Sequence, residues 1–153
     1  IFLPMETYAK YCDYTTDPEI NPNYIKPAML QQRLQKIMDE YAGGVSTYYM
    51  TSKTMLERGL EYLRMTKQDS FHMGARDLHE LLRAWENFHR LIAAEAHARH
   101  IMFREETRYP GYYYRGDFLA IDDENWKCFT NSTYDSKTGE FKVLKRDYHQ
   151  IVS

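Results

Sequence analysis

The sequence has few cysteines and no long apolar run. These two features argue against a disulfide-rich secreted domain and against a membrane-spanning helix. Its two cysteines, Cys12 and Cys128, lie far apart and do not make the disulfide framework of a small secreted domain. Reduced thiols and a cytoplasmic location are therefore the expectation. No apolar stretch approaches the roughly 20 residues that a helix needs to cross a bilayer. The first residues hold neither a signal peptide nor an initiating Met, which predicts a fragment of a longer protein.

The seven glycines form no nucleotide-binding pattern. Neither a Gly-x-Gly-x-x-Gly turn nor a Walker loop occurs among them, and Rossmann-type FAD binding needs such a turn after a strand. Two cysteines cannot ligate a four-iron cluster, which takes four thiolates. No Gly-x-Ser-x-Gly motif of a serine hydrolase is present. The sequence thus predicts no catalytic and no cofactor-binding residue in this chain.

Histidine spacings suggest a metal site only in part. Glu86-x-x-His89 resembles half of a di-iron carboxylate site, and His97-x-x-His100 places two imidazoles near one another on a helix. A di-iron bundle needs a second Glu-x-x-His motif on a facing helix, and the sequence has none. We therefore expect no metal ligands here, but a polar face that is hydrated or packed on another domain.

Composition is that of one globular domain, with an excess of aromatic residues. The 153 residues are 43% hydrophobic and 27% charged, and the net charge of -2 gives no general attraction to nucleic acid. Aromatic residues make up 15%, with fourteen tyrosines. Tyrosine combines an apolar ring with a polar tip, which suits interfaces between domains or subunits.

Helical spacing predicts a mainly α fold, a three-helix bundle of the spectrin-repeat type. Pro27 suits the first position of a helix, and Gly43-Gly44 ends that helix. A second helix begins near residues 52–54, where Thr54-x-x-Glu57 fits a capping box, and it ends by residue 69.

The third helix spans residue 75 to about residue 105, without Pro or Gly. Its predicted apolar stripe consists of Leu78, Leu81, Trp85, Phe88, Ile92, Ala96 and Phe103. Beyond Trp126, the turn signal at residues 135–139 between apolar segments predicts a small C-terminal β-hairpin. The organisation expected is an irregular segment at 1–26, a helical bundle at 27–124, and the hairpin with its tail at 125–153, all in one domain.

The most distinctive stretch runs from Arg104 to Asp117, at the point where Pro110 must stop the third helix. It holds three arginines, three acids and four tyrosines in fourteen residues. Arginine suits bidentate carboxylate recognition and stacking on rings. Although a nucleic-acid patch has a similar composition, the neighbouring acids favour an internally paired ionic junction.

This stretch resembles the C-terminal helical domain of the fumarate reductase and succinate dehydrogenase flavoprotein family. That domain carries Arg-x-Glu-Ser-Arg-Gly-x-His, then Arg-x-Asp, then a Trp. The matching residues here are Arg104, Glu106, Thr107, Arg108, Arg115, Asp117 and Trp126. Tyr109-Pro-Gly111 replaces the Gly-x-His, and this variant is similar to the adenylylsulfate reductase alpha-subunit branch of the family. Further segments with the same resemblance cover essentially the whole chain.

The resemblance implies a function for the parent protein. Members of that branch reduce adenylylsulfate to sulfite and AMP, or run the reverse, at FAD, with electrons from an iron–sulfur beta subunit that holds two four-iron clusters. The flavin and substrate residues belong to FAD and capping domains that this chain lacks, so none is transferred to it. Because the histidine of the family motif is missing here, the resemblance does not imply that the parent protein acts on succinate or fumarate.

The resemblance implies a packing role for the fragment itself, toward the FAD and capping domains and the beta subunit. The interface residues expected are Arg104, Arg108, Tyr112, Arg115, Asp117 and Trp126. The alternatives are a free-standing helical adaptor that binds a protein partner and, as a third interpretation, a small metalloprotein.

Overall fold

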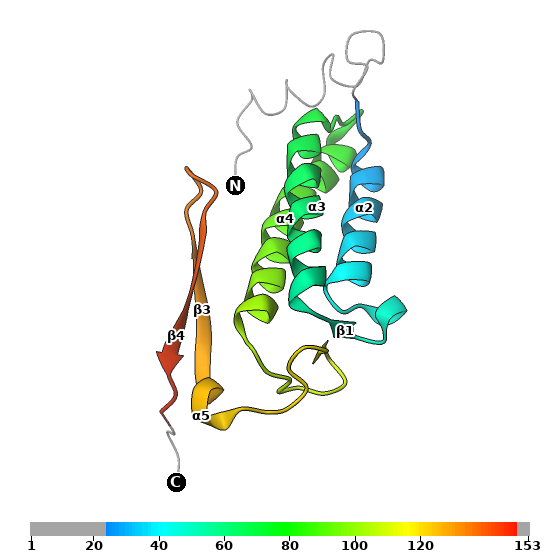
Figure 1. Ribbon diagram of the computed structural model, residues 1–153. Coiled ribbons are helices and arrows are strands. Elements are labelled where there is room, and N and C mark those ends of the chain that lie inside the picture. The colour runs from blue at the N-terminus through cyan, green and yellow to red at the C-terminus, as the bar shows by residue number, and fades with distance from the viewer. Residues whose placement is uncertain (1–23, 150–153) are drawn as a thin grey trace. The chain divides into compact units, whose positions relative to one another are not determined.

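The computed structural model describes residues 24–149, and its architecture is mainly helical with a C-terminal hairpin (Figure 1). The elements are α2 (Pro27–Tyr41), η2 (Val45–Thr47), β1 (Met50–Thr51), α3 (Lys53–Asp69), η3 (Ser70–His72), α4 (Leu78–Phe103), β2 (Tyr114–Arg115), α5 (Asp123–Trp126), β3 (Cys128–Tyr134) and β4 (Phe141–Asp147). The predicted fold class is confirmed. The expected N-terminal segment lies outside the described residues except for its last three positions, and so does Cys12.

The described residues group into two compact units. One contains residues 24–37 with Glu61–Ala93, and the other contains Met38–Leu60 with residues 94–149. Each unit includes a segment of all three long helices. No helix within residues 24–149 is long and apolar enough to span a membrane.

The first unit has an apolar core with one buried amide. Leu30 is fully buried on α2, and Leu63 on α3 and Leu81 on α4 are nearly so. Asn87, also fully buried, donates from Nδ2 to the carbonyl oxygen of Pro27 at 2.8 Å, which satisfies a backbone group at the start of α2. This contact ties the first turn of α2 to the middle of α4.

The buried face of α4 differs from the predicted stripe. Its buried residues are Leu81, Ala84, Asn87, Leu91, Ala94, Ala98 and Ile101. These positions recur every three or four residues, as expected for one helix face. Of the predicted stripe only Leu81 belongs to this set, and Leu78 is 68% exposed. The prediction was wrong because it followed the large aromatic side chains, whereas alanines occupy the contact face.

The helix termini use caps that the sequence prediction only partly located. The backbone N–H of Met55 donates to Ser52 Oγ at 3.4 Å, so Ser52 caps α3 and Thr54 lies inside the helix. The predicted capping box was therefore misplaced. Asp77 caps α4 by accepting from the Glu80 N–H at 2.8 Å.

Two glycines shape the helix ends, and Gly43 ends α2 as predicted. Gly43 follows the end of α2 with a φ of 80°, the left-handed conformation that glycine adopts freely. Gly59 faces Tyr41, and a Cβ added at Gly59 would lie 2.7 Å from the Tyr41 Cβ. The lack of a side chain at Gly59 therefore lets the end of α2 approach α3 closely.

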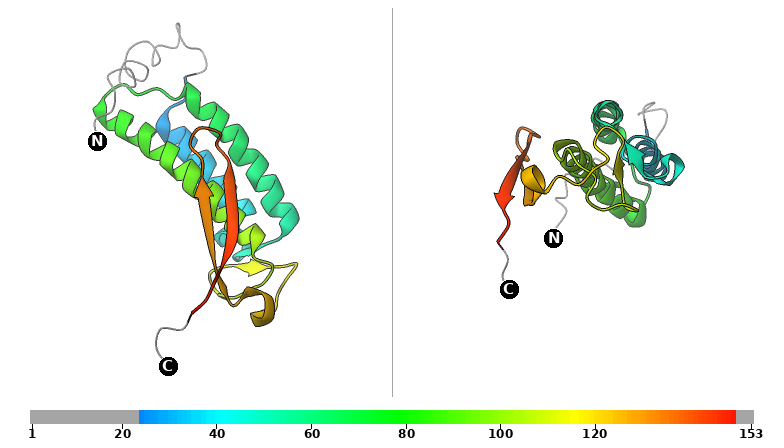
Figure 2. Two further views of the ribbon diagram at one scale, coloured as in Figure 1. Left: turned by 90° about the vertical axis from the view of Figure 1, so that its left-hand side faces the viewer. Right: turned by 60° about the horizontal axis from the view of Figure 1, so that its bottom comes forward.

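The second unit adds two small sheets to the helix ends. Strands β1 and β2 pair in parallel, with Met50 opposite Tyr114. Strands β3 and β4 form an antiparallel ladder of seven residue pairs, and Figure 2 shows them side by side along their length. The turn between them closes through a bond from the Gly139 N–H to the Asp135 carbonyl oxygen at 2.7 Å. The predicted hairpin and its turn are confirmed, whereas the β1–β2 pair was not predicted.

Candidate functional site

Arg115 closes the C-terminal end of α4 from a fully buried position. Its Nη1 donates to the carbonyl oxygens of Ile101 at 2.6 Å, Met102 at 3.1 Å and Arg104 at 2.8 Å. The last carbonyl groups of a helix lack intrahelical partners and carry partial negative charge, so a guanidinium is well suited to them. Arg115 therefore ends the helix and compensates its dipole.

Asp117 extends this arrangement to a second helix. Its two carboxylate oxygens accept from Nε and Nη2 of Arg115, each at 2.8 Å, in a bidentate pair. Oδ2 also accepts from the backbone N–H of Lys53, the first residue of α3, at 2.9 Å. The hydrogen bonds from Arg115 lower the pKa of the Asp117 carboxyl to about 2. One ion pair thus connects the C-terminus of α4 to the N-terminus of α3, with the sign of charge that each dipole favours.

Glu106 is a fully buried carboxylate between two arginines. It forms an ion pair with Arg104 and accepts from Arg108 Nε at 2.6 Å and Nη2 at 2.9 Å. The backbone N–H of Asp122 donates to it at 2.9 Å. Burial alone raises the pKa of Glu106, but the hydrogen bonds from Arg108, Asp122 and Arg104 outweigh burial and hold its pKa below the ordinary value. Glu106 is therefore ionised, and both of its carboxylate oxygens accept hydrogen bonds.

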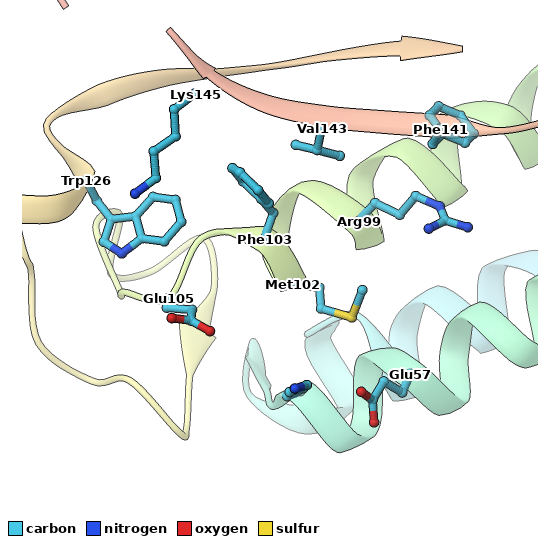
Figure 3. A pocket seen from close by; sticks show the side chains of 10 residues that line it. Glu57, Arg99, Met102, Phe103, Glu105, Trp126, Phe141, Val143 and Lys145 are labelled. Atoms are coloured by element: carbon cyan, nitrogen blue, oxygen red, sulfur yellow. The ribbon is translucent and has the colours of Figure 1, made fainter. Parts of the chain in front are cut away.

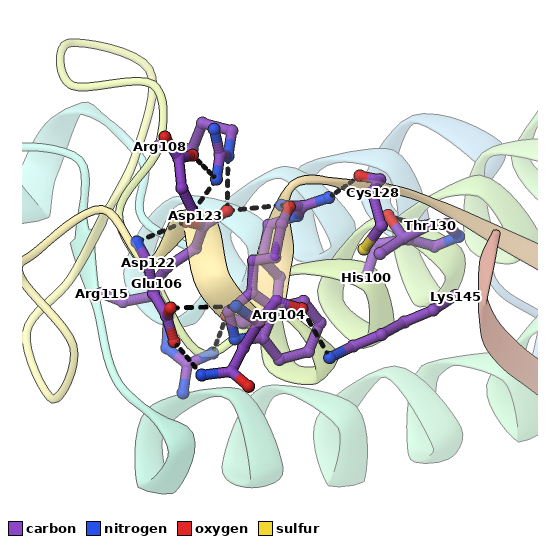
Figure 4. A network of polar contacts seen from close by, with 12 residues as sticks. His100, Arg104, Glu106, Arg108, Arg115, Asp122, Asp123, Cys128, Thr130 and Lys145 are labelled. Atoms are coloured by element: carbon purple, nitrogen blue, oxygen red, sulfur yellow. Dashed lines mark hydrogen bonds and ion pairs between the residues drawn. The ribbon is translucent and has the colours of Figure 1, made fainter. Parts of the chain in front are cut away.

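The two arginines that hold Glu106 also reach the next segment of the chain (Figure 4). Arg104 donates to the carbonyl oxygens of Trp126 and Cys128, both at 2.8 Å, and its guanidinium lies 5.6 Å from the Trp126 ring centroid. Arg108 Nη2 donates to Asp123 Oδ1 at 2.8 Å. These contacts fix the end of α4 against α5 and the start of β3.

Thr107 fastens the loop that leads to β2. Its Oγ1 donates to the Phe118 carbonyl oxygen at 2.8 Å and accepts from the Arg115 N–H at 2.9 Å. The position needs a hydroxyl that both donates and accepts, which Thr supplies as well as the Ser of the resembled family motif.

The structure gathers five of the six predicted interface residues into one place. Arg104, Arg108, Arg115, Asp117 and Trp126 belong to or border this network, which we call the ionic junction together with Glu106, Thr107 and Asp123. The prediction of an internally paired junction is confirmed. Tyr112 stands apart from it and is 82% exposed. The contribution of Lys53, through its backbone, carried no sequence signal.

The chemistry of the ionic junction is structural. Its arginines are already committed to carboxylates and carbonyl oxygens within the chain, so none presents a free fork to a ligand. In the part of the chain that the structure describes, no three His, Cys, Asp or Glu side chains are grouped to hold a metal ion. The arrangement positions loops and strands around the end of α4.

Those loops carry exposed apolar side chains, which together we call the tyrosine end. Its exposed residues are Val45, Tyr48, Tyr49, Met50, Tyr109, Tyr112, Phe118, Leu119 and Ile121. The β1–β2 pair joins the two loops that carry them. Tyr48 and Tyr49 both have positive φ, 53° and 62°, a conformation that costs free energy in residues other than glycine. No pattern in the sequence indicates this backbone strain.

Comparison with known proteins identifies the family to which this architecture belongs. Residues 31–151 match the family described as the fumarate reductase flavoprotein C-terminal domain. The chain belongs to this family. It is 52% identical over 152 residues to the adenylylsulfate reductase subunit alpha of Megalodesulfovibrio gigas, covering 99% of the chain and 23% of that protein. The expected resemblance is confirmed.

Solved structures agree. A structure of adenylylsulfate reductase from the hyperthermophilic Archaeoglobus fulgidus matches 98% of the chain and 23% of its own, with 51% identity and a TM-score of 0.85. Escherichia coli quinol fumarate reductase matches 97% of the chain and 24% of its own at 17% identity and a TM-score of 0.74, which shows the shared fold alone. The chain therefore spans about a quarter of the length of these relatives.

Proposed function

We propose that this chain is the C-terminal helical domain of an adenylylsulfate reductase alpha subunit. The observation that carries the proposal is the identity of about half the residues, sustained over 99% of the chain, with that subunit. In the parent protein, adenylylsulfate would undergo two-electron reduction to sulfite and AMP, or the reverse oxidation, at FAD. An iron–sulfur beta subunit with two four-iron clusters would exchange the electrons, in the cytoplasm.

Within that enzyme the domain has a packing role. The ionic junction holds the loops of residues 45–51 and 109–121, and the tyrosine end lies on these loops. Large exposed apolar groups gathered on one surface are typical of protein interfaces. Tyr112 is the predicted interface residue that would contact the FAD and capping domains or the beta subunit. Arg104, Arg108, Arg115, Asp117 and Trp126 would support that surface from inside.

Reconstitution tests this proposal. The chain is co-expressed with the FAD and capping domains and the iron–sulfur subunit of an adenylylsulfate reductase, and both co-purification and AMP-dependent sulfite oxidation are measured. We expect both to require the chain. A well-folded chain that fails to associate would overturn the proposal and favour the other candidate, a free-standing helical adaptor, which the exposed tyrosine end would also suit.

A further inference from the structure

The C-terminal hairpin has an unpaired edge. Within residues 24–149, β3 and β4 form a two-stranded sheet, and no third strand pairs with either of them. In an antiparallel pair each strand directs every second N–H and C=O group away from its neighbour. The outer edge of β4 therefore offers a row of free backbone groups, which is a template for another strand.

A groove runs beside β4 in the same unit, lined by five apolar and five charged side chains, of which Glu57 and Glu105 are acidic. It has a volume of about 620 Å³, within the range of ligand-binding clefts. Phe141, Val143 and Lys145 of β4 line one side, and Met102 and Phe103 of α4 line another (Figure 3). Trp126 closes one end, with Lys145 Nζ 3.6 Å from its ring centroid. A chain that paired with β4 would place alternate side chains in this groove.

The charge on the hairpin is uneven. Strand β4 carries Lys142, Lys145 and Arg146, with Asp147 as its one acid, whereas β3 has no charged residue. Lys142, Leu144 and Arg146 alternate with the residues that line the groove, so they lie on the opposite face of the strand. The edge of β4 thus combines an apolar face with a cationic face.

We propose that the β4 edge and its groove bind an extended acidic segment of a partner polypeptide as a third strand. Apolar side chains of that segment would fill the groove, and its acids would face Lys142 and Arg146. This is the mode of recognition in which main-chain hydrogen bonds supply affinity and alternate side chains supply specificity. The inference goes beyond the proposed function and does not depend on it.

Charge complementarity selects this occupant over a second copy of the chain. If β4 paired with the β4 of another molecule, Lys142, Lys145 and Arg146 would approach the same cations. Like charges on paired strands are destabilising. An acidic strand converts the same positions into attractive pairs.

Peptide binding tests the inference. A fluorescein-labelled peptide of seven residues, alternating Glu and Val to match the length of β4, is titrated with the chain at low salt and followed by fluorescence anisotropy. We expect saturable binding. A peptide of the same sequence with N-methyl groups on alternate amides keeps its side chains but cannot complete the ladder, and should bind at least about tenfold more weakly.

Reversing the charge on β4 provides a second test of the inference. The double variant K142E/R146E should lose affinity for the Glu–Val peptide by about tenfold or more and should bind the matching Lys–Val peptide. That gain of binding also shows that the variant is folded. The control Lys137→Glu lies in the exposed hairpin turn and should leave both affinities unchanged.

Three results would overturn the inference. No binding of the Glu–Val peptide would remove the site, and equal binding of the N-methylated peptide would show attraction by charge without strand addition. A concentration-dependent dimer in light scattering that the neutral variant K142A/R146A strengthens would assign the edge to a second copy of the chain.

Discussion

Glu106 is buried between two guanidinium groups, and its negative charge makes the burial of Arg104 and Arg108 possible. An ion pair taken out of water adds little net stability compared with an apolar pair, but a buried charge left without its partner is costly. The ionic junction is therefore sensitive to the loss of this one carboxylate.

Glu106→Gln should lower the free energy of unfolding by about 3–5 kcal/mol. The substitution keeps the shape of the side chain but leaves Arg104 without its carboxylate and Arg108 with the exposed Asp123 alone. Urea denaturation followed by helical circular dichroism measures the change. Glu105→Gln is the matched control, since Glu105 is exposed, and should stay within about 0.5 kcal/mol of the original. Equal effects of the two substitutions would contradict the role assigned to Glu106.

Asp117 should make the stability of the fold depend on pH in the acid range. Its folded pKa of about 2 lies below its ordinary value of 3.8, so the ion pair with Arg115 stabilises the fold above about pH 4 and is lost as the pH falls toward 2. Asp117→Asn lacks this titration. The stability difference between the original chain and this variant should be constant above about pH 5 and shrink between pH 4 and 2, as measured by denaturation at each pH. A difference that persists unchanged to pH 2 would argue against the pair.

Among the elements, those encoded by local patterns could be predicted from the sequence. Proline at the start and glycine beyond the end located α2 to the residue, and the turn between 135 and 139 located the hairpin. The β1–β2 pair could not be predicted, because two-residue strands have no period and their partners lie more than sixty positions apart. The residues of the ionic junction could be predicted, because its arginines and acids lie close together in the sequence. Its link to Lys53 could not, because that hydrogen bond depends on tertiary contacts.

The face of α4 was misassigned because hydrophobicity and burial are different quantities. Alanine and one asparagine fill the contact positions, since small side chains let helices approach closely, while Leu78 and Leu82 remain exposed. Size therefore decides this face more than hydrophobicity does.

Substitutions on the two faces of α4 test whether side-chain size or hydrophobicity decides which face is buried. Ala84→Leu enlarges a fully buried side chain and should lower the free energy of unfolding by about 1–3 kcal/mol through overpacking. Leu78→Gln, at a position of the predicted stripe that is 68% exposed, should change it by less than about 0.5 kcal/mol. Thermal unfolding of both variants measures the contrast, and the reverse order of effects would restore the predicted stripe.

For the whole molecule, the tyrosine end is the feature that the chain alone does not explain. Two consecutive tyrosines hold a costly backbone conformation, and Tyr48 is 85% exposed. Strain of this kind persists where the surroundings or a function require it. The chain spans only 23% of the relatives it matches, so the remainder of such a subunit is available to cover this surface.

The double variant Tyr112→Glu with Leu119→Glu tests that conclusion on the proposed parent enzyme. Both side chains are mostly exposed, so the unfolding temperature of the chain should stay nearly constant, whereas co-purification with the FAD and capping domains should fall by about tenfold or more. Met65→Glu, which places a charge on exposed α3 surface in the other unit, is the control and should co-purify normally. If the double variant assembles as well as the control, the tyrosine end does not contact the rest of the subunit, and the conclusion is wrong.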